Sequence, residues 1–183
     1  MMKPKEGQWK NIDVDGEKRT YHTKCWEDDK HRYVLELRWE TNLPTKKILA
    51  ILLNPSIADS GDSDPTSRNL IRLLKDYSFI VLCNLYPHRS PQPKKAILDN
   101  EIAKKFNDKI LKKYIDKFDE IFCGWGGNKL KITKGLYDKR IDEIFQMLKG
   151  KILWKKKGSL INGKYPRHPG YISCEGDIEP YTT

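Results

Sequence analysis

Polar residues able to bind or activate a small molecule directly follow three apolar stretches of the chain, and a fourth polar segment lies beyond the last of the predicted helices and strands. They form the segments Asn54-Pro55-Ser56, Asn84-Leu85-Tyr86-Pro87-His88, Gly124-Trp125-Gly126 and Arg167-His168-Pro169-Gly170. Carboxamides donate and accept hydrogen bonds at once, an imidazole can donate to a developing anion, and aromatic rings can stack on a flat group. These residue types together suit recognition of a heterocycle and acid–base chemistry at a neighbouring bond.

The stretches that precede these segments predict strands and helices in alternation. Strands buried on both faces are expected from short runs of apolar and β-branched residues, namely 47–53, 79–83, 119–123 and 152–154. Helices are expected from amphipathic spacing, namely from Pro65 with Asp64 as its N-cap, over 95–117 and over 137–149.

This alternation predicts a three-layer α/β/α fold, in which helices cover both faces of a central, mainly parallel sheet of about four strands. The carboxyl ends of parallel strands meet at one edge, where ligands bind in such sheets. The first three polar segments would therefore converge on one rim, with the fourth just beyond it.

The N-terminal region is expected to extend this core within a single domain covering 1–183. Residues 1–17 show no apolar period and are expected to pack loosely. Residues 18–45 predict a β-hairpin, with strands at 18–26 and 32–40 around a polar turn. The α/β core then covers 46–174.

The composition indicates which classes of partner would suit the protein but does not select one of them. Lys and Arg total 35 against 25 Asp and Glu, a net charge of +10, which favours DNA, another nucleic acid or a nucleotide as partner. A solvated Lys-rich surface explains the same charge equally well.

Other features of the sequence point to a cytoplasmic protein. It has no apolar run of the ~20 residues that span a bilayer, and it starts with no signal-peptide core. Four cysteines without a CxxC pair predict small buried thiols in a reducing compartment. No spacing of metal ligands and no nucleotide-cofactor motif is present, so the site is expected to need no metal and no cofactor.

The series ILAILLNPS, FIVLCNL, IFCGWGG and RHPGYIS resembles the motif order of the uracil-DNA glycosylase superfamily. In that superfamily a Pro-containing catalytic loop, an Asn that reads a flipped base, a Trp-Gly pair and a His-Pro loop follow one another. The wider pattern LNPSxAD…DPT…NL…WG…HP is similar to an uncharacterised bacterial and phage domain family. The resemblance covers about residues 46–174 and implies a uracil-DNA-glycosylase-like fold.

The resemblance implies an N-glycosidase that excises a modified or mismatched base from DNA by base flipping and water attack. Asn54 would position the water, and Asp59 or Asp64 would supply a carboxylate beside the cationic sugar. His168 would donate to the developing carbonyl anion. Residues expected to bind the base are Asn84, Tyr86, Trp125 and Tyr171. Residues expected to bind phosphates are Ser56, Arg89, Lys164, Arg167 and Gly170.

Structural roles compete with several of these assignments. Asp64 is also the expected helix cap, Asp59 can close an Asx turn with Gly61, and Trp125 can simply fill space at the sheet edge. Two other functions also fit the sequence: a non-catalytic nucleic-acid-binding module that kept the pocket, and an enzyme acting on free nucleotides or nucleosides.

Overall fold

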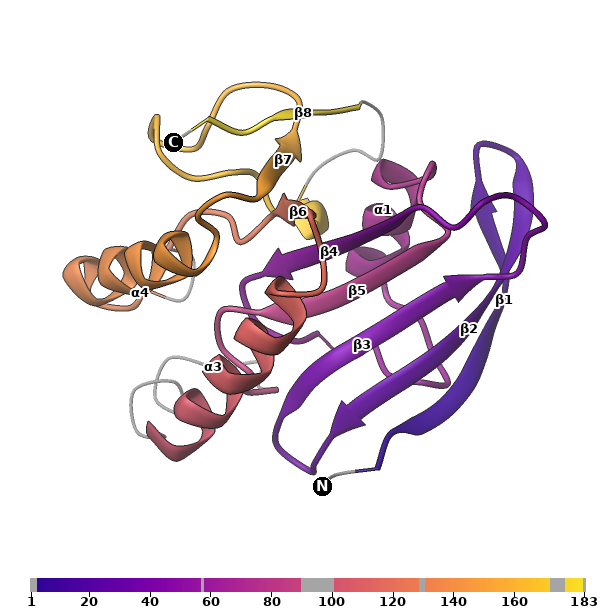
Figure 1. Ribbon diagram of the computed structural model, residues 1–183, viewed down its shortest axis with the longest axis horizontal. Helices are drawn as coiled ribbons and strands as arrows, with labels where there is room; N and C mark the ends of the chain where they lie inside the picture. Colours follow the sequence, from indigo (N-terminus) through magenta and orange to yellow (C-terminus); the bar gives the residue numbers. More distant parts are fainter. Residues whose placement is uncertain (1–2, 57, 90–100, 129–130, 172–176, 183) are drawn as a thin grey trace.

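The computed structural model describes residues 3–56, 58–89, 101–128, 131–171 and 177–182. Within them the strands form one sheet in the order β1-β2-β3-β5-β4-β6-β7-β8 (Figure 1). The strands are β1 (Lys5–Val14), β2 (Glu17–Glu27), β3 (Arg32–Trp39), β4 (Lys47–Leu52), β5 (Phe79–Asn84), β6 (Glu120–Cys123), β7 (Ile152–Lys156) and β8 (Ile178–Pro180). The helices are α1 (Pro65–Leu73), α3 (Glu101–Ile115), α4 (Lys134–Met147) and the short 3-10 helix η1 (Pro169–Tyr171).

The sheet is mixed, so the expected central, mainly parallel sheet of a glycosylase-like three-layer fold is wrong. In the described residues, β4 pairs in parallel with β5 and β6, and β6 pairs in parallel with β7. The other four pairs, β1–β2, β2–β3, β3–β5 and β7–β8, are antiparallel. The difference arises because β3 hydrogen-bonds along the free edge of β5, where a four-stranded sheet would leave backbone groups unpaired.

The N-terminal hairpin is confirmed, because β2 and β3 pair in the predicted antiparallel arrangement. The loose N-terminus is wrong: residues 5–14 form β1, and Trp9, Ile12 and Val14 of this strand are buried. The pairing register with β2 shifts between Trp9 and Ile12, where Asn11 has a φ of 57°. This irregularity interrupts the period-two pattern by which a strand is recognised in sequence.

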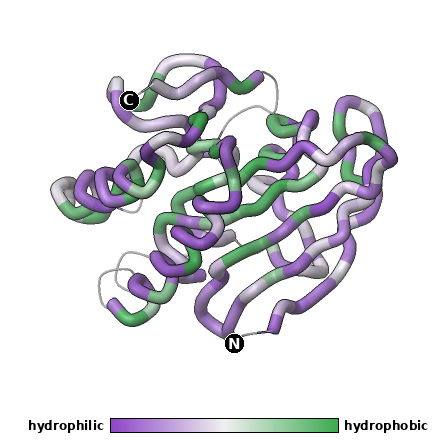
Figure 2. The backbone as a smooth tube through the Cα atoms, in the orientation of Figure 1, coloured by the Kyte–Doolittle hydropathy of each residue, from purple (hydrophilic) through white to green (hydrophobic). Residues whose placement is uncertain are grey.

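Two apolar cores lie on the two faces of the sheet. Leu70, Ile71 and Leu74 belong to the segment of α1 and pack on one face, over Leu52 and Leu82. On the other face, α3 and α4 pack over side chains of β4, β5 and β6. Figure 2 shows the central strands as mostly hydrophobic, whereas the helices alternate between hydrophobic and hydrophilic stretches.

Helix α1 begins as the sequence predicts. Asp64 accepts a hydrogen bond from the Ser67 backbone N–H at 2.7 Å, and the Ser67 hydroxyl accepts one from the Asp64 N–H at 3.0 Å. Pro65 occupies the first turn. This reciprocal capping box satisfies backbone donors that would otherwise be unpaired in the protein interior.

Two smaller expectations concern cysteines and membranes. Cys25, Cys83 and Cys123 are free and buried, as predicted, whereas Cys174 lies outside the described residues. No helix in the described part of the chain is both long and apolar enough to cross a bilayer.

The burial of β1 makes a stability prediction. Trp9 is 3% exposed, and its indole N–H donates to the Asp59 carbonyl at 3.1 Å. We expect Trp9→Ala to lower the free energy of unfolding by about 3–5 kcal/mol, the usual cost of removing a buried aromatic side chain. Urea denaturation followed by circular dichroism measures it. Lys10→Ala, at the exposed neighbouring position, is the control, and equal stability of both variants would contradict the fold described here.

Candidate functional site

The first three polar segments lie together at the carboxyl ends of β4, β5 and β6. Leu52 and Asn84 are register partners in the parallel β4–β5 pair. Beyond the strands, the Leu85 N–H donates to the Leu52 carbonyl at 2.8 Å, and the Gly124 N–H donates to the Ile51 carbonyl at 2.9 Å. The expected rim therefore exists, within a sheet different from the expected one.

The fourth segment packs onto the same rim. A methyl group on Gly124 would lie 2.9 Å from a Leu52 methyl and 3.2 Å from Pro169, and one on Gly126 would lie 3.0 Å from the His168 Cβ. Gly126 also has a φ of 75°, which favours glycine. Glycines in the third segment thus allow the His168 loop to approach the strand ends closely.

Helix α1 holds this loop from the other side. The Asn69 side chain donates to the Pro169 carbonyl at 3.0 Å, and Gly170 lies against Thr66, close to the start of the helix. The loop after β4, the start of α1 and the His168 loop therefore form one packed unit.

Asp64 is held at the centre of the β4–α1 loop as a buried carboxylate. Besides capping α1, it accepts a hydrogen bond from the Ala58 N–H at 3.3 Å and interacts with the Ser56 hydroxyl. Burial acts to raise the pKa of Asp64, but hydrogen bonds from Ser56, Ser67 and Ala58 outweigh it and hold this pKa below its usual value. The geometry favours the capping role of Asp64 over water activation.

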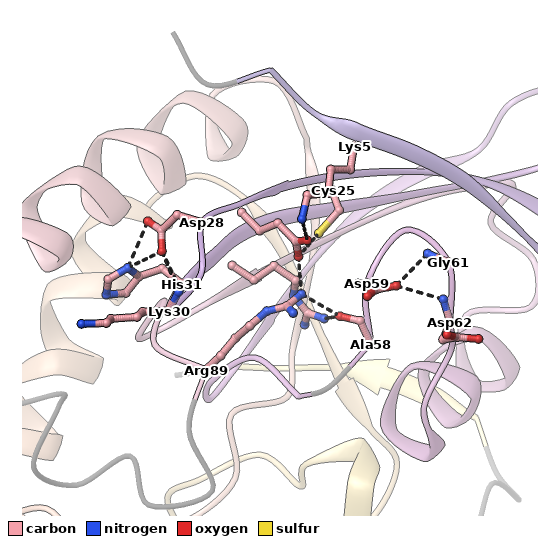
Figure 3. A network of polar contacts seen from close by, with 12 residues as sticks. Lys5, Cys25, Asp28, Lys30, His31, Ala58, Asp59, Gly61, Asp62 and Arg89 are labelled. Carbon is pink, nitrogen blue, oxygen red and sulfur yellow. Dashed lines mark hydrogen bonds and ion pairs between the residues drawn. The ribbon is translucent and has the colours of Figure 1, made fainter.

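Asp59 closes a turn within the same loop. Its carboxylate accepts from the Gly61 N–H at 2.7 Å and from the Asp62 N–H at 3.0 Å (Figure 3). Burial acts to raise the pKa of Asp59, but these backbone donors and the nearby Arg89 lower it overall. Both expected catalytic carboxylates therefore accept hydrogen bonds from backbone N–H groups. This agrees with the competing structural roles, a helix cap for Asp64 and an Asx turn for Asp59.

The backbone of Ala58 is held through both its N–H and its carbonyl. Its N–H is bound by Asp64, while its carbonyl accepts from Arg32 Nη1 at 2.5 Å and from Arg89 Nη2 at 3.1 Å. Arg89 also pairs with Glu27. Figure 3 shows the Arg89 side chain extending to Ala58. Arg89, expected to bind phosphate, therefore holds the loop, and Arg32 is a participant that sequence reasoning missed.

Asn84 ends β5 as a buried carboxamide. It is 1% exposed, and within the described part of the chain neither its amide nitrogen nor its carbonyl oxygen has a hydrogen-bond partner. Ile80 and Leu82 belong to the core under α1, so alternation along β5 places Asn84 on the same face. Burying both polar atoms of a side chain without partners costs about 1–3 kcal/mol per group.

Two buried side chains fix the backbone around Asn84. The Asn107 amide of α3 donates to the Asn84 carbonyl at 3.0 Å. Arg140 of α4 donates to the Leu85 carbonyl through Nε at 3.1 Å and Nη2 at 2.8 Å. Sequence reasoning missed both residues, although their spacing was a signal. Asn107 lies on the same buried face of α3 as Ala103 and Leu111, and Arg140 lies on the same buried face of α4 as Tyr137 and Ile144.

His168 is oriented by its own loop. Its Nδ1 accepts a hydrogen bond from the Gly170 N–H at 3.0 Å. The proton of the neutral ring therefore sits on Nε2, which makes that nitrogen a donor. The Gly170 N–H, expected to bind phosphate, is used instead to set this tautomer.

Two of the expected base-binding residues lie on the opposite side of the sheet. Trp125 is fully buried beside Phe145 and Tyr181, with ring centroids 5.5 Å and 6.4 Å away. Tyr86 lines a cavity of about 300 Å³ between α3 and α4, with Arg140 over its ring. Their placement favours packing roles. The side chain of Tyr171 lies outside the described residues.

The remaining expected residues occupy two places. Asn54 is half-buried and donates to the Pro55 carbonyl at 3.1 Å. Lys164 pairs with Asp138 at 3.2 Å, and Arg167 donates to the Ser159 carbonyl at 3.1 Å. The loop after β4 thus holds Asn54, Ser56, Asp59 and Asp64, Asn84 ends the neighbouring strand, and the loop of His168 and Gly170 packs on the same rim. Lys164 and Arg167 are bound to partners of their own.

Residues 32–170 match the protein family DUF1643, described as a protein of unknown function. The chain belongs to this family. The DUF1643 match begins at Arg32 and ends at Gly170, so it contains the clamp on Ala58 and all four polar segments. No curated protein and no solved structure matches the chain.

The role of Asp64 makes a prediction about stability and pH. We expect Asp64→Ala to lower the free energy of unfolding by about 1–2 kcal/mol at pH 7, the usual cost of losing an N-cap. Because the folded-state pKa of Asp64 is lowered, this difference is fully present above the ordinary value of 3.8 and is lost as pH falls through the folded value. Urea denaturation between pH 3 and 7 measures it.

Asp62→Ala, at an exposed position of the same loop, is the control. A difference between Asp64→Ala and wild type that grows as the pH is lowered would contradict a capping carboxylate.

Proposed function

We propose that this protein hydrolyses the N-glycosidic bond of a modified or mismatched nucleobase in DNA. The observation that carries the proposal is the Asn84 carboxamide, which is buried with both polar atoms unpartnered at the carboxyl edge of the sheet. A carboxamide offers one donor and one acceptor side by side, which matches the edge of a nucleobase. A flipped base would satisfy both atoms.

The neighbouring residues support the remaining steps. Bond cleavage leaves negative charge on the departing base, and the Nε2–H of His168 is a donor suited to stabilise it. Water must approach the sugar from the other side. Asn54 uses its amide nitrogen on Pro55, and its amide oxygen is an acceptor suited to orient that water.

The engaged carboxylates of Asp59 and Asp64 favour a second candidate, a module that binds the base without cleaving it. With both groups accepting backbone hydrogen bonds, neither is left to activate water strongly. The two candidates share base recognition by Asn84 and differ in turnover. One experiment therefore tests both.

We expect the wild type to release a base from one member of an oligonucleotide panel carrying uracil, mismatched thymine, and bulky modified pyrimidines and purines, in single and double strands. Asn84→Leu should abolish release. It should leave the melting temperature equal or higher, because replacing an unpartnered buried polar group by an apolar one of similar size removes a desolvation cost. Mass spectrometry detects the free base, and thermal unfolding monitors the fold.

Asn42→Leu, at an exposed position, is the matched control and should retain release. Salt-sensitive binding without release, weakened by Asn84→Leu, would replace the glycosidase by the binding module. A strong loss of stability in Asn84→Leu would instead assign this carboxamide a structural role and remove the basis of the proposal.

A further inference from the structure

Arg32 is a buried cation whose hydrogen bond within the described residues goes to a neutral carbonyl. The residue is 1% exposed. Of the five N–H donors of its guanidinium, one makes a hydrogen bond within the described residues, from Nη1 to the Ala58 carbonyl, while Nε is buried without a partner. Buried arginines normally satisfy their donors with carboxylates or carbonyls, because an unpaired buried charge is strongly destabilising.

Arg89 brings a second guanidinium to the same point. It donates to the Ala58 carbonyl at 3.1 Å (Figure 3). Since Arg32 donates to the same carbonyl, two cations share one neutral acceptor. Among the described residues, the Nε of Arg89 also has no partner. Its side chain is 24% exposed, so the pair consists of one enclosed cation and one that reaches solvent.

Glu27 and Asp64 favour the charged form of Arg32, but within the described residues neither carboxylate forms an ion pair with it. Glu27 is bound to Arg89, to Lys5 at 3.0 Å and to the Cys25 thiol at 3.1 Å. Asp64 is engaged by the loop and the helix start, as described above. Burial lowers the pKa of Arg32 and, together with the charge of Arg89, outweighs the opposing effects of Cys25, Asp64 and Glu27. An anion between the two guanidinium groups would remove this imbalance.

We propose that Arg32 and Arg89 form a site for a phosphate group. The planar guanidinium presents paired donors that fit a tetrahedral oxyanion, and phosphate oxygens are strong acceptors for charged donors. Ala58, where the two cations meet, lies four residues beyond Asn54 on the same loop. Resting on the proposed function, the site would hold a phosphate of the substrate whose base Asn84 binds; as a binding site, it stands without that function.

The alternative is that Arg32 only clamps the loop. The two roles make opposite predictions for Arg32→Met, which keeps the length of the side chain and removes the charge. If Arg32 serves an anion, the variant folds at least as stably in the absence of anions and loses its response to phosphate. If Arg32 is only a clamp, the variant is less stable and the wild type shows no response to lose.

The test is thermal unfolding of the full chain with inorganic phosphate, against sodium chloride at matched ionic strength. We expect phosphate to raise the melting temperature of the wild type in a saturable manner. Arg32→Met and Arg89→Gln should each weaken the apparent phosphate affinity at least about tenfold. Arg38→Met, at an exposed arginine of the same strand, should keep the wild-type response.

A wild type that responds equally to phosphate and chloride would overturn the site, as would a wild-type response in Arg89→Gln. Arg89→Gln decides the matter if Arg32→Met does not fold. Titrations with a deoxynucleoside monophosphate and with unmodified DNA identify the source of the phosphate. Whichever of the two binds more tightly than inorganic phosphate is that source. Phosphate binding without base release would refute the glycosidase and keep this site.

Discussion

The structure depends on how the backbone of Ala58 is held inside the protein. Ala58, in the loop after β4, is fully buried, so its N–H and carbonyl cannot hydrogen-bond to water and need protein partners. Asp64 supplies an acceptor, and Arg32 and Arg89 supply donors. These three residues come from the cap of α1, from β3 and from the segment after β5, so the backbone of one residue ties together three distant parts of the chain.

This constraint explains why the sheet extends on its N-terminal side. Besides supplying Arg32, the antiparallel strands reach the loop through Trp9, which donates to the Asp59 carbonyl, and Thr23, which donates to the Ser60 carbonyl at 2.6 Å. On the opposite face, Asn107 and Arg140 hold the carbonyls of Asn84 and Leu85. The connections that leave β4 and β5 are thus both fixed by side chains from other elements.

Local patterns in the sequence were enough to locate many elements but not their assembly. The apolar runs of β4 and β5, the hairpin of β2 and β3, and the Asp64-Pro65 helix start are encoded by neighbouring residues, and the structure contains each of them. The pairing of β3 with β5 joins segments that are over 40 residues apart, and no local signal specifies it. For β1, a bulge removes the alternation that would have revealed the strand.

The candidate site was predictable to a similar extent: its position in the sheet could be predicted, but the face that each side chain occupies could not. The order of polar segments after strands was enough to locate the rim, because that inference depends only on where the strands end. Which face a side chain occupies depends on the pleat of each strand. Trp125 shares the parity of Cys123, which faces α3 and α4, and this could not be known before the two faces were distinguished. Arg32 looked like an ordinary polar position of a hairpin strand, since its burial arises from segments distant in sequence.

The polar groups of the rim fall into two kinds, and the difference bears on function. Asp59, Asp64 and Arg140 hydrogen-bond to backbone groups and stabilise the loops around them. Within the described residues, Asn84 leaves both of its polar atoms unpaired, and Arg32 leaves its Nε unpaired although it also holds the Ala58 carbonyl. An unpaired buried polar group costs stability, so folding alone does not account for these unpaired atoms. Asn84 ends β5, and Arg32 contacts the connection after β4. Incomplete hydrogen bonding within a rigid frame is what a preorganised binding site requires, because the ligand supplies the missing partners and the protein need not rearrange.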